Sequence, residues 1–189
     1  SGDVDFTNTC DIRSSRTYGP NVQINSFYAD LHFHGTQIHG RRLLIKTGTD
    51  GFFGLPACHT NLLLLDTGTK IYSDDEVLNL QYEWSGPLTI NPGVTIHSTY
   101  TSDDNYSIAI YATGNTNIDG DIRANNSIWL FVKDGDLTIN GYGIKITPGI
   151  NNYQKSFYFG TVDTNLSDAI KCNVTAYDFA LNQNTTESR

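Results

Sequence analysis

The feature that most constrains the fold of this chain is the alternation of apolar and polar residues within short blocks. Clear examples lie at residues 22–24, 31–33, 78–82 and 108–110, and the blocks are rich in β-branched and aromatic residues. Side chains alternate between the two faces of a strand, so a period of two predicts strands with one buried face. Helical periodicity is nearly confined to residues 165–170, and we therefore expect an all-β protein.

Glycine, asparagine, aspartate and proline separate these blocks at short intervals, as turns do. Residues 128–132, Ile-Trp-Leu-Phe-Val, are apolar throughout and indicate a strand buried on both faces. Many short strands joined by such turns predict an Ig-like or jelly-roll β-sandwich. Because no linker or shift in composition interrupts the chain, we expect one domain over residues 1–189.

A second pattern supports an alternative fold, a right-handed β-solenoid. A glycine is followed two or three residues later by leucine or isoleucine, at intervals in the twenties of residues, and such a period is typical of stacked coils. Hairpin turns also place glycine before strands, so the pattern fits both folds. The pairs are Gly40 and Leu43, Gly68 and Ile71, Gly93 and Ile96, Gly120 and Ile122, and Gly141 and Ile144.

The charge of the chain disfavours two classes of partner. Lys and Arg number 12 against 20 Asp and Glu, which gives a net charge of −8. An acidic surface repels both nucleic-acid backbones and anionic lipid headgroups. No apolar stretch approaches the roughly 18 residues that a membrane helix needs. A start at Ser1, the absence of Met and a charged fraction of only 17% lead us to expect a secreted or cell-surface domain whose signal peptide has been removed.

Three cysteines are present, Cys10, Cys58 and Cys172, and no pair has the spacing of a zinc knuckle or redox motif. In an oxidising compartment we expect a disulfide between Cys10 and Cys58, with Cys172 left over. Closing a loop of that size stabilises a protein by roughly 4 kcal/mol in the chain-entropy model. Three reduced, buried thiols are the alternative.

Histidines provide a candidate metal site. His32 and His34 are two residues apart on an expected strand and therefore point to the same side. Two imidazoles in this arrangement could bind one zinc ion, with His59 as the third ligand; His39, His97 or Asp30 are alternatives. Partly exposed strand histidines without a metal are the simpler interpretation.

Polar and aromatic residues in expected loops form a candidate carbohydrate site. The chain has 11 Tyr, 9 Phe and 2 Trp. Sugar sites combine aromatic faces, which pack on the apolar side of the sugar ring, with Asp and Asn side chains that bind its hydroxyls. Ordinary strand or turn residues are the alternative for each position. The candidate ligand-binding residues are Asp74, Asp75, Trp84, Asp103, Asp104, Asn105, Tyr106, Asn151, Asn152 and Tyr153.

Catalytic motifs find little support. The chain contains no Gly-x-Ser-x-Gly elbow, no His-Glu-x-x-His pair and no glycine-rich phosphate loop. The acidic clusters at residues 74–76 and 103–104 lie in expected turns, where aspartate is favoured by local hydrogen bonding. We therefore expect a domain that is not an enzyme, and a secreted glycan-active or metal-dependent hydrolase is the alternative.

The order of these features resembles the receptor-binding domains of chaperone–usher pilus tip adhesins. The resemblance consists of a cysteine after an N-terminal strand (residues 5–10), strands at 22–24 and 40–45, Cys58, and late strands at 128–132, 143–146 and 174–181. It implies an elongated Ig-like sandwich that binds host glycans through loops at its tip, sometimes with a histidine-bound zinc. Cys172 has no counterpart in that scheme. The recurrence of glycine and isoleucine also looks like fungal solenoid wall adhesins.

Together these features predict an extracellular adhesin domain that binds a cell-surface glycan or glycoprotein without chemical turnover, with zinc as a possible cofactor. A fibre or pilus subunit that assembles with its neighbours by strand exchange is the structural alternative.

Overall fold

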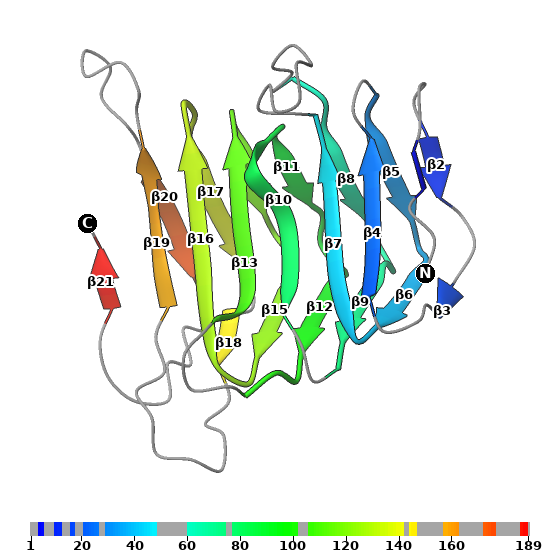
Figure 1. Cartoon of the computed structure of the whole chain (residues 1–189). Coiled ribbons are helices and arrows are strands. Elements are labelled where there is room, and N and C mark those ends of the chain that lie inside the picture. Colours follow the sequence, from blue (N-terminus) through cyan, green and yellow to red (C-terminus); the bar gives the residue numbers. More distant parts are fainter. Residues whose placement is uncertain are drawn as a thin grey trace.

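The computed structural model is built from three parallel sheets, through which the chain winds in rotation (Figure 1). It describes residues 21–26, 29–48, 60–74, 77–101 and 106–140, without the side chains of 83 and 84, and the backbone alone of the strands outside these ranges. Within this described part there is no helix long and apolar enough to cross a membrane.

The first sheet has eight strands, which occur in sequence order. They are β1 (Val4–Asp5), β4 (Asn21–Ser26), β7 (Arg42–Thr47), β10 (Leu78–Ser85), β13 (Tyr106–Thr113), β16 (Ser127–Lys133), β19 (Phe157–Val162) and β21 (Thr186–Ser188).

The second sheet has seven strands and the third has six. The second contains β2 (Cys10–Ile12), β5 (Leu31–His34), β8 (Leu63–Asp66), β11 (Leu88–Ile90), β14 (Thr116–Ile118), β17 (Leu137–Gly141) and β20 (Cys172–Ala176). The third contains β3 (Arg16–Thr17), β6 (Gln37–Gly40), β9 (Lys70–Ser73), β12 (Thr95–Ser98), β15 (Asp121–Ala124) and β18 (Ile144–Ile146).

The prediction of an antiparallel Ig-like or jelly-roll sandwich is wrong. Each strand from β1 to β17 pairs in parallel with the strand three places later in the chain, as β4 does with β7 and β6 with β9. A parallel pair requires the chain to return to the same end of the sheet, and here the passage through the other two sheets provides that return. The winding is therefore solenoid-like, with one strand per sheet in each coil, and β1 and β21 lie at opposite ends of the stack (Figure 1).

Apolar side chains inside the coils form continuous rows. In the third sheet Ile38, Ile71, Ile96 and Ile122 pair in register, and each is fully buried. Comparable rows of leucine and isoleucine run inside the first and second sheets. Because the strands are parallel and in register, each buried side chain packs against the same position in the next coil, which accounts for the strong period of two in the sequence.

The strand β16 differs from the prediction of burial on both faces. Ile128, Leu130 and Val132 are fully buried, whereas Trp129 and Phe131 are only partly buried. Two faces of one strand point in opposite directions, so these two aromatic rings lie on the outside of the first sheet.

Tight turns join the second sheet to the third. The backbone N–H of Thr69 donates to the carbonyl of Asp66 at 3.0 Å, and Gly68 between them has a φ of 84°. The turn in the next coil is equivalent, with Gly93 at a φ of 79°, and the Gly68 N–H donates to the carbonyl of Gly93 at 3.2 Å. Glycine adopts this left-handed conformation without steric cost, so the same residue recurs at this corner.

Truncating a side chain within an interior row should destabilise the stack of coils. We expect Ile96→Ala to lower the free energy of unfolding by about 2–5 kcal/mol, because it removes buried methyl groups and leaves a cavity between coils. Thr95→Ala, one residue earlier on the partly exposed face, is the matched control and should change it by about 0.5 kcal/mol or less. Chemical denaturation measures both, and equal effects would contradict the inward placement of Ile96.

Candidate functional site

Aromatic side chains gather on the outer face of the first sheet. They come from three neighbouring strands, β10, β13 and β16, and all are partly buried. We call this set the aromatic face, and its members are Tyr82, Tyr106, Tyr111, Trp129 and Phe131.

The rings of the aromatic face contact one another across the strands. The ring centroids of Tyr82 and Tyr111 are 5.5 Å apart, and those of Tyr111 and Phe131 are 5.7 Å apart. Tyr106 and Trp129 form the third pair at 5.1 Å, with ring planes inclined by 48°. These separations are close to the spacing of neighbouring strands, about 4.8 Å, because adjacent strands supply the rings.

A bulge in β10 positions Tyr82. Leu80 pairs with Ile110 and Ser85 with Ala112, so residues 81–84 of β10 lie opposite Tyr111 alone. Bulges of this kind redirect side chains and are common beside functional sites.

Gln81 holds the bulge from inside the coil. Its side chain is fully buried and its backbone has a φ of 49°, which is strained for a residue other than glycine. The Oε1 atom accepts a hydrogen bond from the backbone N–H of Thr47 at 2.7 Å. Its Nε2 donates to the Thr47 Oγ1 at 2.7 Å and to the carbonyls of Gly86 and Pro87 at 2.9 Å each.

Tyr82 and Tyr106, on the neighbouring strands β10 and β13, share a side-chain hydrogen bond. Burial, followed by the charge and hydrogen bond of Tyr82, raises the pKa of Tyr106 to about 12. Burial and Tyr82 also raise the pKa of Tyr111. The phenols of Tyr106 and Tyr111 therefore remain protonated well above neutral pH and can donate or accept hydrogen bonds there.

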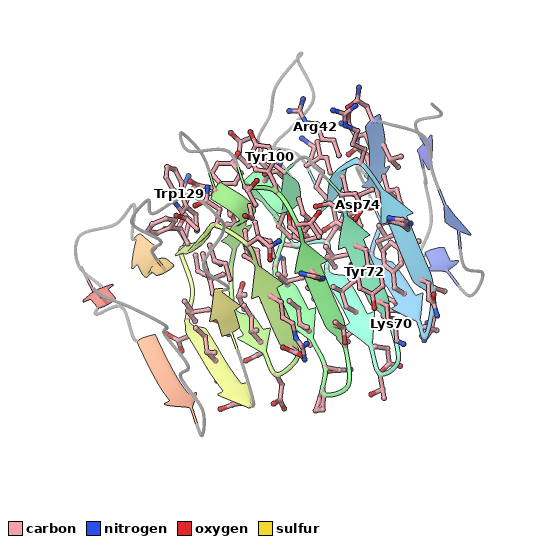
Figure 2. All side chains as sticks on the ribbon, turned by 90° about the horizontal axis from the view of Figure 1, so that it is seen from below. Arg42, Lys70, Tyr72, Asp74, Tyr100 and Trp129 are labelled. Atoms are coloured by element: carbon pink, nitrogen blue, oxygen red, sulfur yellow. The ribbon has the colours of Figure 1, made fainter. Side chains whose placement is uncertain are left out.

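Cationic side chains border the aromatic face. Arg42 is exposed at the start of β7, and its charge acts on Tyr106 in the direction that lowers the pKa. Lys46 and Lys133 lie near the other ends of β7 and β16 and are partly buried. Figure 2 shows Arg42, Tyr100 and Trp129 along one edge of the molecule, apart from Lys70 and Tyr72 of the third sheet.

The structure distributes the predicted ligand-binding residues among several places. Tyr106 belongs to the aromatic face, and the backbone of Trp84 lies in the β10 bulge. Asp74 follows β9 at the corner that leads to β10, where its carboxylate forms an ion pair with His39. The others lie outside the described residues: Asp75, Asp103, Asp104, Asn105, Asn151, Asn152 and Tyr153.

The two strand histidines lie together on the outside of the second sheet. His32 and His34 of β5 are both partly exposed, with ring centroids 6.0 Å apart. The Nδ1 atom of His34 is 3.5 Å from the Asp66 carboxylate on β8. The predicted third ligand, His59, lies outside the described residues, and among those described no three His, Cys, Asp or Glu side chains form a metal-binding group.

The Asp66 carboxylate is held by its neighbours rather than poised for proton transfer. A hydrogen bond from the Asn91 side chain at 3.1 Å and one from the backbone N–H of Thr67 at 2.8 Å lower its pKa, and His34 adds to the effect. A lowered pKa keeps the group ionised at neutral pH, as a structural acceptor at a turn requires.

The positions of the backbone strands exclude a disulfide between Cys10 and Cys172. Cys10 starts β2 and Cys172 starts β20, the two end strands of the seven-stranded second sheet. Six strand spacings of about 4.8 Å put their Cα atoms roughly 29 Å apart, beyond the reach of a disulfide between them. Cys58 lies outside the described residues, so the predicted Cys10–Cys58 bond stays a prediction.

A polar ladder on the third sheet had no counterpart in the sequence analysis. His39, Tyr72, His97 and Arg123 occupy equivalent positions in four successive coils. The rings of His39 and Tyr72 are 6.4 Å apart, as are those of Tyr72 and His97, and Arg123 pairs with Asp121. These four residues are irregularly spaced in the sequence, so their alignment could be recognised only if the length of each coil were already known.

Comparison with known proteins gives no relative: no protein-family model, curated protein or solved structure matches the chain. The class of protein is therefore defined by its fold and surface, a parallel β protein of stacked coils with an aromatic outer face.

Replacing Gln81 should loosen the bulge. We expect Gln81→Leu to lower the free energy of unfolding by about 1–3 kcal/mol, since the buried N–H of Thr47 loses its acceptor. Chemical denaturation gives the loss, and near-ultraviolet circular dichroism should show altered packing of Tyr82. Gln37→Leu, an exposed glutamine on β6, is the control. An unchanged near-ultraviolet spectrum would contradict the role assigned to Gln81.

The pKa of Tyr106 can be read from a pH titration. The folded protein holds this proton to about pH 12, whereas an ordinary tyrosine loses it near 10.0. The unfolded chain therefore deprotonates first, so the stability due to this shift is complete below pH 10 and is lost as the pH rises toward 12. We expect the phenolate absorbance of the wild type to show one tyrosine that titrates near pH 12, and that of Tyr106→Phe to lack this step. Loss of a group with an ordinary midpoint would contradict the assignment.

Proposed function

We propose that this chain is a carbohydrate-binding domain that holds a linear polysaccharide on the aromatic face without chemical turnover. The observation that carries the proposal is the set of five partly exposed rings on three neighbouring strands. Side chains on the outside of the coils do not contribute to the interior rows, so the need for a packed core does not account for this cluster.

The spacing of the rings suits a chain of sugars. Aromatic faces pack against the C–H faces of pyranose rings. The ring contacts repeat at 5.1–5.7 Å across the strands, close to the length of one pyranose unit. The ring planes of Tyr111 and Phe131 are inclined by only 33°, so a polysaccharide that runs along the stack, perpendicular to the strands, would meet these two rings with successive sugars.

Polar groups at the same face complement the sugar hydroxyls. The raised pKa values of Tyr106 and Tyr111 keep these two phenols protonated at neutral pH, and Arg42 stands at the edge. Binding sites for small polar molecules combine an apolar lining with a few such groups that fix orientation. Partial burial of the rings against one another also limits the conformational entropy lost when a ligand binds.

The charge of the chain supports a neutral or weakly charged glycan over other linear polymers. Stacked aromatic rings with nearby cations also suit single-stranded nucleic acid. A net charge of −8 opposes that partner, because phosphate contacts supply most of its affinity. In the extracellular setting that the composition favours, such binding would serve adhesion to a cell-surface glycan or glycoprotein.

Glycan binding can be tested directly with matched aromatic variants. We expect the wild type to bind at least one linear polysaccharide in a panel of glucans, mannans, galactans and chitin oligosaccharides, measured by glycan array and calorimetry. Trp129→Ala should weaken that binding about tenfold or more, because the sugar loses a stacking partner. Tyr72→Ala on the third sheet, also partly exposed and in contact with other rings, is the control and should bind normally.

Three results would count against the proposal. Equal loss in the Trp129 and Tyr72 variants would remove the aromatic face from the binding site. Release of new reducing ends from any polysaccharide would replace a binding domain with a hydrolase. Absence of binding to every glycan, together with concentration-dependent assembly of the pure protein, would favour the fibre-subunit alternative.

A further inference from the structure

Asn79 is a buried polar residue on β10, one of the three strands that carry the aromatic face. Its neighbours on β10, Leu78 and Leu80, point into the core, so Asn79 points outward. Yet only 5% of Asn79 is exposed. Within the part of the chain that the structure describes, its Oδ1 atom has no hydrogen-bond donor.

The position of Asn79 in the sheet places it across from Trp129. Asn79 pairs with Ala109 of β13, and Ala109 pairs with Trp129 of β16. Ala109 carries only a methyl group, so no long side chain stands between the amide of Asn79 on one side and the indole on the other. Two strand spacings, about 10 Å, separate the Cα atoms of Asn79 and Trp129, which is wide enough for a sugar ring.

Two tyrosine rings contact residues of the neighbouring strands close to this part of the sheet. Tyr106 contacts Trp129, which is level with Ala109, and Tyr82 contacts Tyr111, two residues farther along β13. Asn79 and Ala109 are both buried, whereas the rings of Tyr82 and Tyr106 are partly exposed.

An unsatisfied buried amide oxygen is costly, since a buried acceptor has given up its hydrogen bonds to water. An apolar residue of similar size would avoid that cost. The retention of an amide at this position is therefore explained if a bound molecule supplies the missing donor.

We propose that Asn79 is a specificity-determining residue that accepts a hydrogen bond from a hydroxyl of a sugar bound on the aromatic face. This inference rests on the proposed function and identifies the sugar by its chemistry. The sugar stacks on Trp129 and directs an equatorial or exocyclic hydroxyl toward the floor of the face. A site built to bind a hydroxyl rejects sugars that cannot place one there, because the amide then stays unsatisfied.

A matched pair of asparagines makes the test specific. Asn25 on β4 also points outward, is 6% exposed, and has an Oδ1 atom with no donor among the described residues. Asn25 pairs with Lys46 of β7. Its own strand, β4, is two strands away from β10 and does not contribute to the aromatic face. Asn25→Leu therefore reproduces the chemistry of Asn79→Leu without altering the proposed site.

The experiment measures binding and thermal stability of Asn79→Leu and Asn25→Leu against linear hexasaccharides of glucose, mannose, galactose and N-acetylglucosamine. We expect Asn79→Leu to bind the hexasaccharide preferred by the wild type about tenfold more weakly and to lose most of its discrimination among the four. Its melting temperature should stay the same or rise, since the unsatisfied amide is gone. Asn25→Leu should bind as the wild type does.

The outcomes separate this inference from the proposed function. Loss of binding in Trp129→Ala with normal affinity and discrimination in Asn79→Leu would overturn the role of Asn79 and leave the glycan site standing. A lower melting temperature of Asn79→Leu than of Asn25→Leu, with unchanged discrimination, would identify Asn79 as a structural residue. Failure of the wild type to bind any of the four hexasaccharides, or any polysaccharide, would overturn both.

Discussion

Backbone hydrogen bonding between parallel strands of successive coils is the constraint on which the rest of this structure depends. Each complete coil contributes one strand to each of three sheets, and outside the bulges each residue of a strand stands next to its equivalent in the neighbouring coil. This register aligns the interior isoleucines into a row. It also places the buried hydroxyls of Ser73 and Ser98 2.9 Å apart, where they hydrogen-bond to each other. The same register aligns the exposed residues, so surface features arise as ladders rather than as isolated side chains.

The aromatic face follows from that alignment together with one local irregularity. Regular pairing alone places Tyr111 beside Phe131 on adjacent strands. The bulge in β10 then adds Tyr82, which a regular strand would not present at this position. Gln81 stabilises the bulge through hydrogen bonds that fully occupy its side-chain amide. A strained backbone supported by buried hydrogen bonds is a pattern that functional sites often show.

The sequence predicted the strands but not the way they pair. Period-two alternation specifies which residues share a face, whereas parallel and antiparallel neighbours satisfy it equally, and the common outcome for short strands with tight turns is a sandwich. The better indicator was the weak recurrence of glycine before isoleucine. Ile71, Ile96 and Ile122 from that recurrence pair in register in the third sheet.

The candidate site was only partly accessible from the sequence, for a related reason. Tyr106 was singled out because polar residues surround it, and it lies on the aromatic face. Trp129 and Phe131 were assigned to the core because residues 128–132 are apolar throughout, which conceals the alternation between the faces. Asn79 sits in a plainly alternating strand and carries no sequence signal at all. Its environment depends on residues 30 and 50 positions later, Ala109 and Trp129, which only the coil register brings alongside.

The connections between the first and second sheets differ greatly in length from one coil to the next. Residues 48–62 join β7 to β8, whereas residues 86–87 join β10 to β11. Since a coil contacts only its immediate neighbours, an insertion at this corner leaves the register of every strand unchanged. The connections at this corner are therefore free to change in length while the strands that carry the aromatic rings keep their register, which separates the evolution of loop length from the maintenance of the fold.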